Sequence, residues 1–290
     1  MWTVAKSGII AFLILAVGQG AWGAMALLNL KTTPAIPWSV AIMAPVLWLM
    51  WQHLGGKGRP RSTSGARRSY LRANAVPAPV FVWSLVAGAL AIVALAGFWI
   101  VMFQLFRMPG NVVPDVSKYP LLTLVALLVM GSLAAPFSEE AAFRGYAQVM
   151  LERKFSAPVA IAISSVMFAL AHLTQGFLLP KLFVYFLAGV AFGVTAWLTK
   201  SILPGIAVHI MADLTFFTMV WPHDTTRRLV ADGGADAWFW LHVAQALLFI
   251  ALAIAAYGRL KLWTTHQEGS NEACRTFIDN RDCVLGTGRP

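Results

Sequence analysis

Long apolar segments constrain the fold of this chain more than any other feature. A helix that crosses a bilayer needs about 20 mostly apolar residues. Such segments recur at about residues 8–30, 37–54, 80–106, 120–148, 158–176, 178–199, 202–221 and 237–258. The chain is 59% hydrophobic and 12% charged, which excludes an ordinary soluble domain. Lipid admits only helices or a closed barrel, and no strand-like alternation is present. The sequence therefore predicts an all-α polytopic membrane protein, a bundle of about eight transmembrane helices.

Basic residues predict the orientation of this bundle. The loop between residues 55 and 78 contains no acidic residue and six basic ones, which are Lys57, Arg59, Arg61, Arg67, Arg68 and Arg72. Loops rich in Lys and Arg stay on the cytoplasmic side of a membrane. With eight spans, both termini are then cytoplasmic, and we expect an integral protein of the plasma (inner) membrane. The net charge of +10 is explained by topology and by contact with anionic membrane lipids, so we expect no nucleic-acid partner.

Polar residues at membrane depth divide the chain into parts. Those with strongly polar side chains fall between Pro120 and Pro222. We therefore predict a membrane scaffold over residues 1–119, with three spans and the basic loop. A core of four spans over 120–221 would carry the chemistry. An outer loop and last span would follow over 222–262, and a polar, disordered tail over 263–290.

The most unusual stretch is Ser138-Glu139-Glu140-Ala141-Ala142-Phe143-Arg144-Gly145, within the fourth apolar segment. Ionisable residues inside a bilayer are costly and usually functional. Glu140 and Arg144 are four residues apart and share a helical face, so we predict an ion pair between them. Glu139 is rotated by about 100° from Glu140. The sequence therefore predicts Glu139 as the working carboxylate, with Glu140 and Arg144 as its support.

Two other apolar segments carry histidines that suit the same chemistry. His172 lies within one of them, at 158–176, and His209 and Asp213 lie four residues apart on one face of another. A carboxylate with two histidines suits hydrolysis of an amide. Glu139 would take a proton from water, one histidine would orient that water, and His209 with its neighbour would stabilise the oxyanion. Glu139, His172, His209 and Asp213 are also of the types that ligate catalytic zinc, although no H-E-x-x-H motif is present.

The residues alone leave three interpretations open. Buried polar side chains also hold membrane helices together, and they form proton or ion relays. A transporter would be expected to show internal repeats or broken helices, and no clear repeat is visible. A hydrolase, a relay and a packing network therefore all agree with the polar cluster.

Three motifs in this order resemble a known family of intramembrane proteases. Residues 139–144 fit E-E-x-x-x-R, residues 168–172 fit F-x-x-x-H, and residues 209–213 fit H-x-x-x-N/D. The glycine-containing run at 189–193 is similar as well. The chain thereby resembles the CAAX-processing and bacteriocin-processing family (CPBP or Abi), which includes the type-II CAAX prenyl endopeptidase. The resemblance covers about residues 120–221.

This resemblance implies an eight-helix bundle that hydrolyses a peptide bond within the membrane. The first glutamate, Glu139, would be catalytic, with His172 as its partner and with His209 and Asp213 as oxyanion stabilisers. Supporting roles would fall to Glu140, Arg144 and Phe168. The family has been described both as metalloproteases and as glutamate-dependent enzymes. A glutamic endopeptidase without a cofactor is the expectation, and zinc held by the four catalytic residues is the alternative.

Asp213 departs from the family's pattern, in which Asn is frequent at this position. An ionised aspartate cannot donate a hydrogen bond to an oxyanion. Asp213 would therefore be protonated, orient His209, or ligate a metal. We expect a site in the cytoplasmic half of the bundle and a substrate that is a membrane-anchored or lipidated peptide or protein. The main alternative is a non-catalytic membrane scaffold or immunity-type protein.

Overall fold

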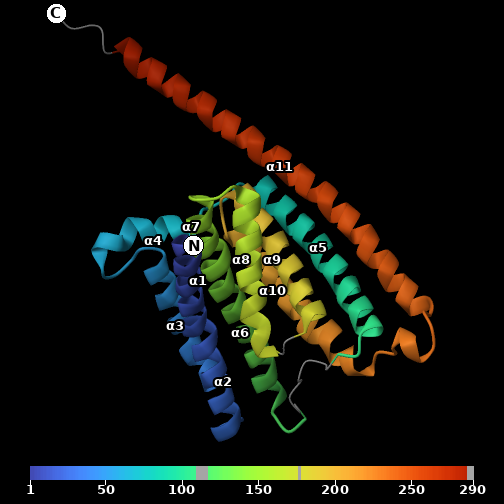
Figure 1. Ribbon diagram of the computed structural model, residues 1–290. Helices are drawn as coiled ribbons and strands as arrows, with labels where there is room; N and C mark the ends of the chain where they lie inside the picture. The colour runs from blue at the N-terminus through green and yellow to red at the C-terminus, as the bar shows by residue number, and fades with distance from the viewer. Residues whose placement is uncertain (109–116, 176–177, 286–290) are drawn as a thin grey trace, which may run out of the picture.

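The chain forms a bundle of helices (Figure 1). The computed structural model describes residues 1–108, 117–175 and 178–285, and within these ranges it contains helices and no strand. The prediction of an all-α protein is therefore confirmed.

Helices form where the apolar segments predict them. In chain order the elements are α1 (Trp2–Leu15), η1 (Ala16–Gly20), α2 (Ala21–Thr32), α3 (Trp38–Leu54), η2 (Arg61–Thr63), α4 (Ser64–Leu71), α5 (Ala78–Leu105), α6 (Leu121–Glu139), η3 (Glu140–Ala147), α7 (Gln148–Glu152), α8 (Ala157–Ala171), η4 (His172–Gln175), α9 (Leu179–Thr199), α10 (Leu203–Thr215), η5 (Phe216–Val220), η6 (Trp221–Thr226), η7 (Val230–Asp232) and α11 (Ala237–Leu285). The segments η1, η3 and η5 are π-helical and continue the α-helices beside them without a break.

Six helical segments in the described ranges are long and apolar enough to cross a membrane. They are Trp2–Thr32, Ala78–Leu105, Leu121–Glu152, Leu179–Thr199, Leu203–Asp232 and Ala237–His266. Two predicted spans are shorter, because α3 has 17 residues and α8 has 15. At about 1.5 Å per residue, each falls short of a hydrocarbon core about 30 Å thick. The chain is an integral membrane protein, and the predicted count of about eight spans is approximate.

The helix α6 lies in the middle of the bundle (Figure 1). It contacts the N-terminal helices α1, α2 and α3, and it contacts α10. The helix α5 packs against α9, α10 and α11. As a result, α6 and its continuation η3 are in contact with both the N-terminal scaffold and the later core helices.

Close packing between α8 and α9 depends on two glycines of α9, Gly189 and Gly193. A Cβ atom added at Gly189 would lie 2.8 Å from Cβ of Ser165, and one at Gly193 would lie 2.9 Å from a methyl carbon of Ile161. Only glycine permits such an approach of two helices. The two glycines of the run at 189–193 therefore let α8 and α9 approach closely.

The basic loop is folded against the bundle rather than merely exposed. Arg67 donates to the carbonyl oxygens of Pro60 and Lys57, each at 3.1 Å. Arg72 forms an ion pair with Glu152 and donates to the carbonyl oxygen of Ala196 at 3.4 Å. Both arginines therefore hold this loop in place, in addition to their charge's effect on topology.

The last helix extends far beyond the bundle (Figure 1). The sequence predicts disorder over 263–290, whereas the backbone of α11 continues as helix to Leu285. Residues 263–285 contain one glycine and no proline, so none of them forces the helix to end. The division of the chain into four parts stays a prediction.

Candidate active site

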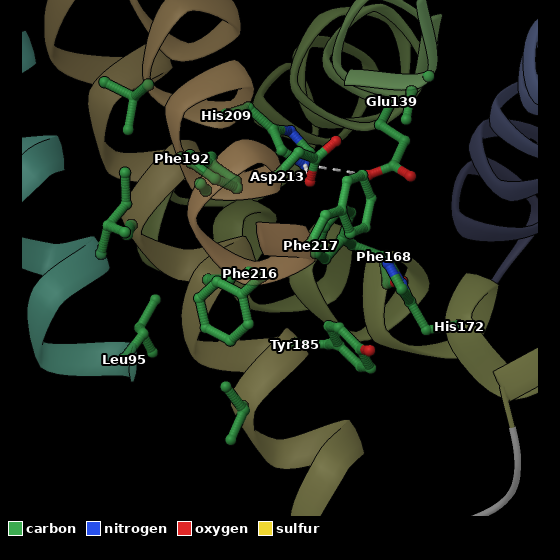
Figure 2. A pocket seen from close by; sticks show the side chains of 18 of the residues that line it. Leu95, Glu139, Phe168, His172, Tyr185, Phe192, His209, Asp213, Phe216 and Phe217 are labelled. Carbon is green, nitrogen blue, oxygen red and sulfur yellow. Dashed lines mark hydrogen bonds and ion pairs between the residues drawn. The ribbon is translucent and has the colours of Figure 1, made fainter. Parts of the chain in front are cut away.

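A cavity of about 450 Å³ lies inside the bundle. Its wall is mostly aliphatic and aromatic, with contributions from α5, α6, α9 and α10. Glu139, His172, His209 and Asp213 all line it (Figure 2). The structure therefore brings the four residues predicted as catalytic to one cavity.

The two glutamates lie where α6 changes into the π-helical segment η3. Such segments are rare and are frequent at functional sites. Every residue of η3 is buried. Ser164 of α8 donates to the carbonyl oxygen of Phe143 at 2.8 Å and so supplies one backbone oxygen of this segment with a partner. The local structure thus places the charged side chains in a dry interior, where uncompensated charge is costly.

His209 of α10 is held between these glutamates. Its Nδ1 lies 3.0 Å from Oε1 of Glu140, and its Nε2 lies 3.5 Å from Oε2 of Glu139. The ring also stacks on Phe192 of α9, with centroids 4.4 Å apart and planes 19° from parallel. Contacts at both nitrogens and on one face therefore fix the position of this imidazole.

Two carboxyl groups lie near Nε2 of His209. This atom lies 3.5 Å from Oε2 of Glu139 and 3.7 Å from Oδ1 of Asp213. A carboxylate only accepts hydrogen bonds, and a lone pair on Nε2 would also only accept. A proton on the ring or on one carboxyl therefore makes the approach of these three groups favourable.

Asp213 lies one helical turn beyond His209, on the cavity side of the ring (Figure 2). Its 3.7 Å separation from Nε2 is too long for a hydrogen bond. The other ring nitrogen is held by Glu140. Orientation of His209 through Nδ1 was one of the roles left open for Asp213. The structure gives this role to Glu140.

The predicted ion pair of Glu140 with Arg144 is present and buried. Nη1 of Arg144 lies 3.4 Å from Oε1 of Glu140, and the two side chains are 1% and 0% exposed. The guanidinium also lies over the ring of Phe168, 4.1 Å from its centroid, where a cation is attracted to the aromatic face. Phe168, predicted as a supporting residue, thus packs against the guanidinium of this arginine.

Glu140 does more than the helical spacing predicts. The sequence assigns it to Arg144 alone, yet the same oxygen, Oε1, is closer to His209, at 3.0 Å against 3.4 Å. The prediction was incomplete because spacing compares residues on one helix, whereas His209 comes from another. Both adjacent glutamates face the same imidazole.

His172 lies at the end of α8, where the chain leaves the α-helix. Its Nδ1 is 2.9 Å from the carbonyl oxygen of Phe168, and its ring stacks on Tyr185 with centroids 4.0 Å apart. A carbonyl oxygen can only accept, so Nδ1 carries the hydrogen. In the neutral ring, Nε2 is then a hydrogen-bond acceptor.

Gln19 is a site residue that the sequence analysis missed. It lies in η1, lines the cavity, and donates from Nε2 to Oε1 of Glu139. A signal for it exists in the sequence, because Gln19 is a carboxamide in the middle of the first apolar segment, residues 8–30. The motifs all lie beyond residue 120, and no spacing rule relates them to the first helix.

The predicted zinc ligands do not form a ready ligand set. Across the ranges that the structure describes, no three His, Cys, Asp or Glu side chains are grouped so that they would hold a metal ion. One nitrogen of His209 is occupied by Glu140 and one nitrogen of His172 by the Phe168 carbonyl.

Comparison with protein families distinguishes among the three interpretations of the polar cluster. Residues 121–215 match a family described as type II CAAX prenyl endopeptidase Rce1-like. This segment is similar to that family. The match confirms the resemblance predicted from the motifs, and it supports a CAAX-type intramembrane protease in general terms. Comparisons with curated proteins and with solved structures give no match.

The Rce1-like segment runs from the start of α6 to the end of α10. It contains Glu139, His172, His209 and Asp213, together with the supporting residues of the site. Gln19 lies outside it. The side chains that meet in the cavity therefore come from the matched segment and from the N-terminal helix.

Proposed function

We propose that this chain is an intramembrane endopeptidase in which Glu139 activates water to hydrolyse a peptide bond. The observation that carries this proposal is the approach of Oε2 of Glu139 to Nε2 of His209, at 3.5 Å, on the wall of an internal cavity. The Rce1-like match over the same residues adds support.

The first step forms a bond between water and the substrate carbonyl carbon. Glu139 accepts a proton from the water through Oε2 as the water oxygen attacks, and the carbonyl π electrons move onto oxygen. In the second step the carbonyl re-forms and the carbon–nitrogen bond breaks. The proton held by Glu139 passes to the leaving nitrogen, so the products are an amine and a carboxylic acid.

His209 is proposed to stabilise the oxyanion as an imidazolium. In that form both ring nitrogens donate, with Nδ1 directed to Glu140 and Nε2 toward the cavity. A donor fixed before reaction stabilises developing charge without reorganisation. Glu140 therefore acts by holding the ring, and Asp213 lies beside the donating Nε2, 3.7 Å away.

His172 is proposed to orient the water or a substrate N–H. Its Nδ1 is bonded to the carbonyl oxygen of Phe168, at 2.9 Å, so Nε2 of the neutral ring accepts a hydrogen bond. Stacking on Tyr185, with planes 21° apart, limits its rotation. An acceptor fixed in this way selects one orientation of the group that it binds.

The substrate is proposed to be a lipidated peptide or protein that ends in a CAAX sequence, as the description of the matched family suggests. The largely apolar cavity wall suits the burial of an apolar chain. The site is proposed to lie in the cytoplasmic half of the bundle, because η3 contacts α4 of the basic loop. Both termini would then be cytoplasmic.

Cleavage by purified protein tests this function. The substrate is an internally quenched peptide with a prenylated cysteine in a C-terminal CAAX sequence, in detergent micelles. We expect cleavage by the wild type and a fall of about 10²–10⁴-fold in kcat for Glu139→Gln, because the general base is lost.

The matched control is Glu152→Gln, which changes a partly buried glutamate that pairs with Arg72 away from the cavity. This control should keep kcat near the wild-type value. Retained cleavage by Glu139→Gln would remove the general-base role, and no cleavage by the wild type of any prenylated or unprenylated peptide would favour a non-catalytic protein.

A further inference from the structure

We infer that Gln19 is a positioning residue for Glu139, so that the N-terminal helix completes the active site of the Rce1-like segment. This inference rests on the proposed function, since it assigns how the reacting carboxylate is held. It concerns a residue outside residues 121–215, the segment that matches the family.

The two oxygens of Glu139 have different surroundings. Oε1 accepts a hydrogen bond from Nε2 of Gln19. Oε2 faces Nε2 of His209 at 3.5 Å and has no hydrogen-bond partner among the described protein atoms, although it is buried. The amide therefore holds one oxygen and leaves the other directed at the cavity.

A neutral donor suits this position. Hydrogen bonds from an amide fix a carboxylate in one rotamer, whereas an Arg or Lys would form an ion pair and compete with the proton that a general base must accept. The cluster already contains one cation, Arg144, which lies against Glu140. Gln19 thus supplies orientation to Glu139 without adding charge.

The backbone places Gln19 by close contact between η1 and α6. Gly18 packs directly on the side chain of Ser138, so a larger residue at 18 would collide with it. Gln19 and Glu139, the next residue on each segment, then meet as well. Two consecutive contacts fix the register between these helices, and the η1 segment is π-helical, as is η3.

Gln245 offers a matched control for the loss of a buried carboxamide. Its Nε2 donates to the carbonyl oxygen of Val93 at 2.9 Å, and its Oε1 is 2.9 Å from Nδ1 of His242. It joins α11 to α5 and does not line the cavity. Its removal therefore costs a comparable interaction between helices without touching Glu139.

The experiment compares Gln19→Met, Gln19→Glu and Gln245→Met. The two Gln19 variants keep the length of the side chain but lose the amide donor. Cleavage of the prenylated CAAX peptide gives kcat and KM, and thermal unfolding in detergent gives stability. We expect kcat to fall by about 10- to 100-fold in both Gln19 variants, as for a lost hydrogen bond to a charged group. KM should stay within about threefold, because the substrate's own contacts remain.

The control separates positioning from a structural role. Gln245→Met should keep kcat and KM near wild type, with a loss of melting temperature at least as large as that of the Gln19 variants. A wild-type kcat in Gln19→Met, or a rise in KM alone, would overturn the inference. So would an equal fall of kcat in Gln245→Met.

Failure of the proposed function gives a different result. If Glu139→Gln cleaves at the wild-type rate, the general-base role itself is wrong, and the inference about Gln19 is overturned with it. If Glu139→Gln is inactive while Gln19→Met is fully active, only the inference about Gln19 is overturned.

Discussion

Glu140 holds the imidazole of His209, with Oε1 of the glutamate 3.0 Å from Nδ1 of the ring. This contact joins η3 to α10 inside the bundle. It leaves the other ring nitrogen directed at Glu139, 3.5 Å away. The two adjacent glutamates therefore have different relations to one histidine, and each relation can be tested.

Replacement of Glu140 by glutamine should impair catalysis through His209. The amide oxygen still accepts from Nδ1, but it no longer stabilises a charged ring. We expect kcat for the prenylated peptide to fall by about 10- to 100-fold, the value of a hydrogen bond to a charged group. Steady-state kinetics on the purified variant checks this, and an unchanged kcat would show that Glu140 serves only Arg144.

Replacement of Arg144 by methionine should lower stability. The change removes the arginine partner of the buried Glu140, and breaking a buried ion pair costs about 3–5 kcal/mol. Unfolding in a detergent–denaturant series measures the free energy. Arg153→Met, which changes an exposed arginine on the same stretch of chain, is the control and should have a much smaller effect. A variant of Arg144 that is fully stable but inactive would instead assign this residue to the chemistry.

Replacement of Asp213 by asparagine should preserve activity. The asparagine keeps the shape of the side chain and adds an N–H donor near Nε2 of His209, which now lies 3.7 Å from Oδ1 of Asp213. A donor at this place can assist the oxyanion, so we expect kcat to stay within about tenfold of wild type, a change of at most about 1.4 kcal/mol in the barrier. Asp213→Leu, which has neither donor nor acceptor, is the comparison. Loss of activity in the asparagine variant would mean that the carboxyl group itself is needed.

Replacement of Gly189 by valine should separate α8 from α9. A Cβ at this position would lie 2.8 Å from Cβ of Ser165, and overpacking of this kind costs about 1–3 kcal/mol. Because α8 carries His172 at its end, we expect lower activity together with lower thermal stability. Gly258→Val in α11, where an added Cβ meets no atom within 4 Å, is the control. Wild-type stability in the Gly189 variant would show that the helices can move apart without cost.

Exhaustive chelation should leave cleavage unchanged. In the described part of the chain no three His, Cys, Asp or Glu side chains have an arrangement that could hold a metal ion, and a catalytic zinc site needs three protein ligands. Elemental analysis of the purified protein, followed by assay before and after chelation, tests this. Activity that is lost on chelation and restored by zinc alone would establish the metal-dependent version of the protease.

The fold could be predicted from the sequence to a large extent. The bounds of α5 and α9 agree with the apolar segments to within two residues. The reason is that a helix forms all backbone hydrogen bonds within one segment, as lipid requires. The predicted count of eight spans agrees less closely with the structure, because α8 ends at Ala171 and is shorter than its apolar segment. Hydropathy alone does not mark where a helix stops.

Composition and hydropathy were enough to predict a helical membrane protein and to identify the ionisable residues within its apolar segments. The ion pair of Glu140 with Arg144 followed from helical spacing alone, since both residues lie on one segment. The packing of helices against one another was needed to show that Glu140 also holds His209 and that Gln19 contacts Glu139. Those contacts depend on how one helix is rotated and shifted against another. Packing of whole helices sets these quantities, and the periodicity within any single segment does not contain them.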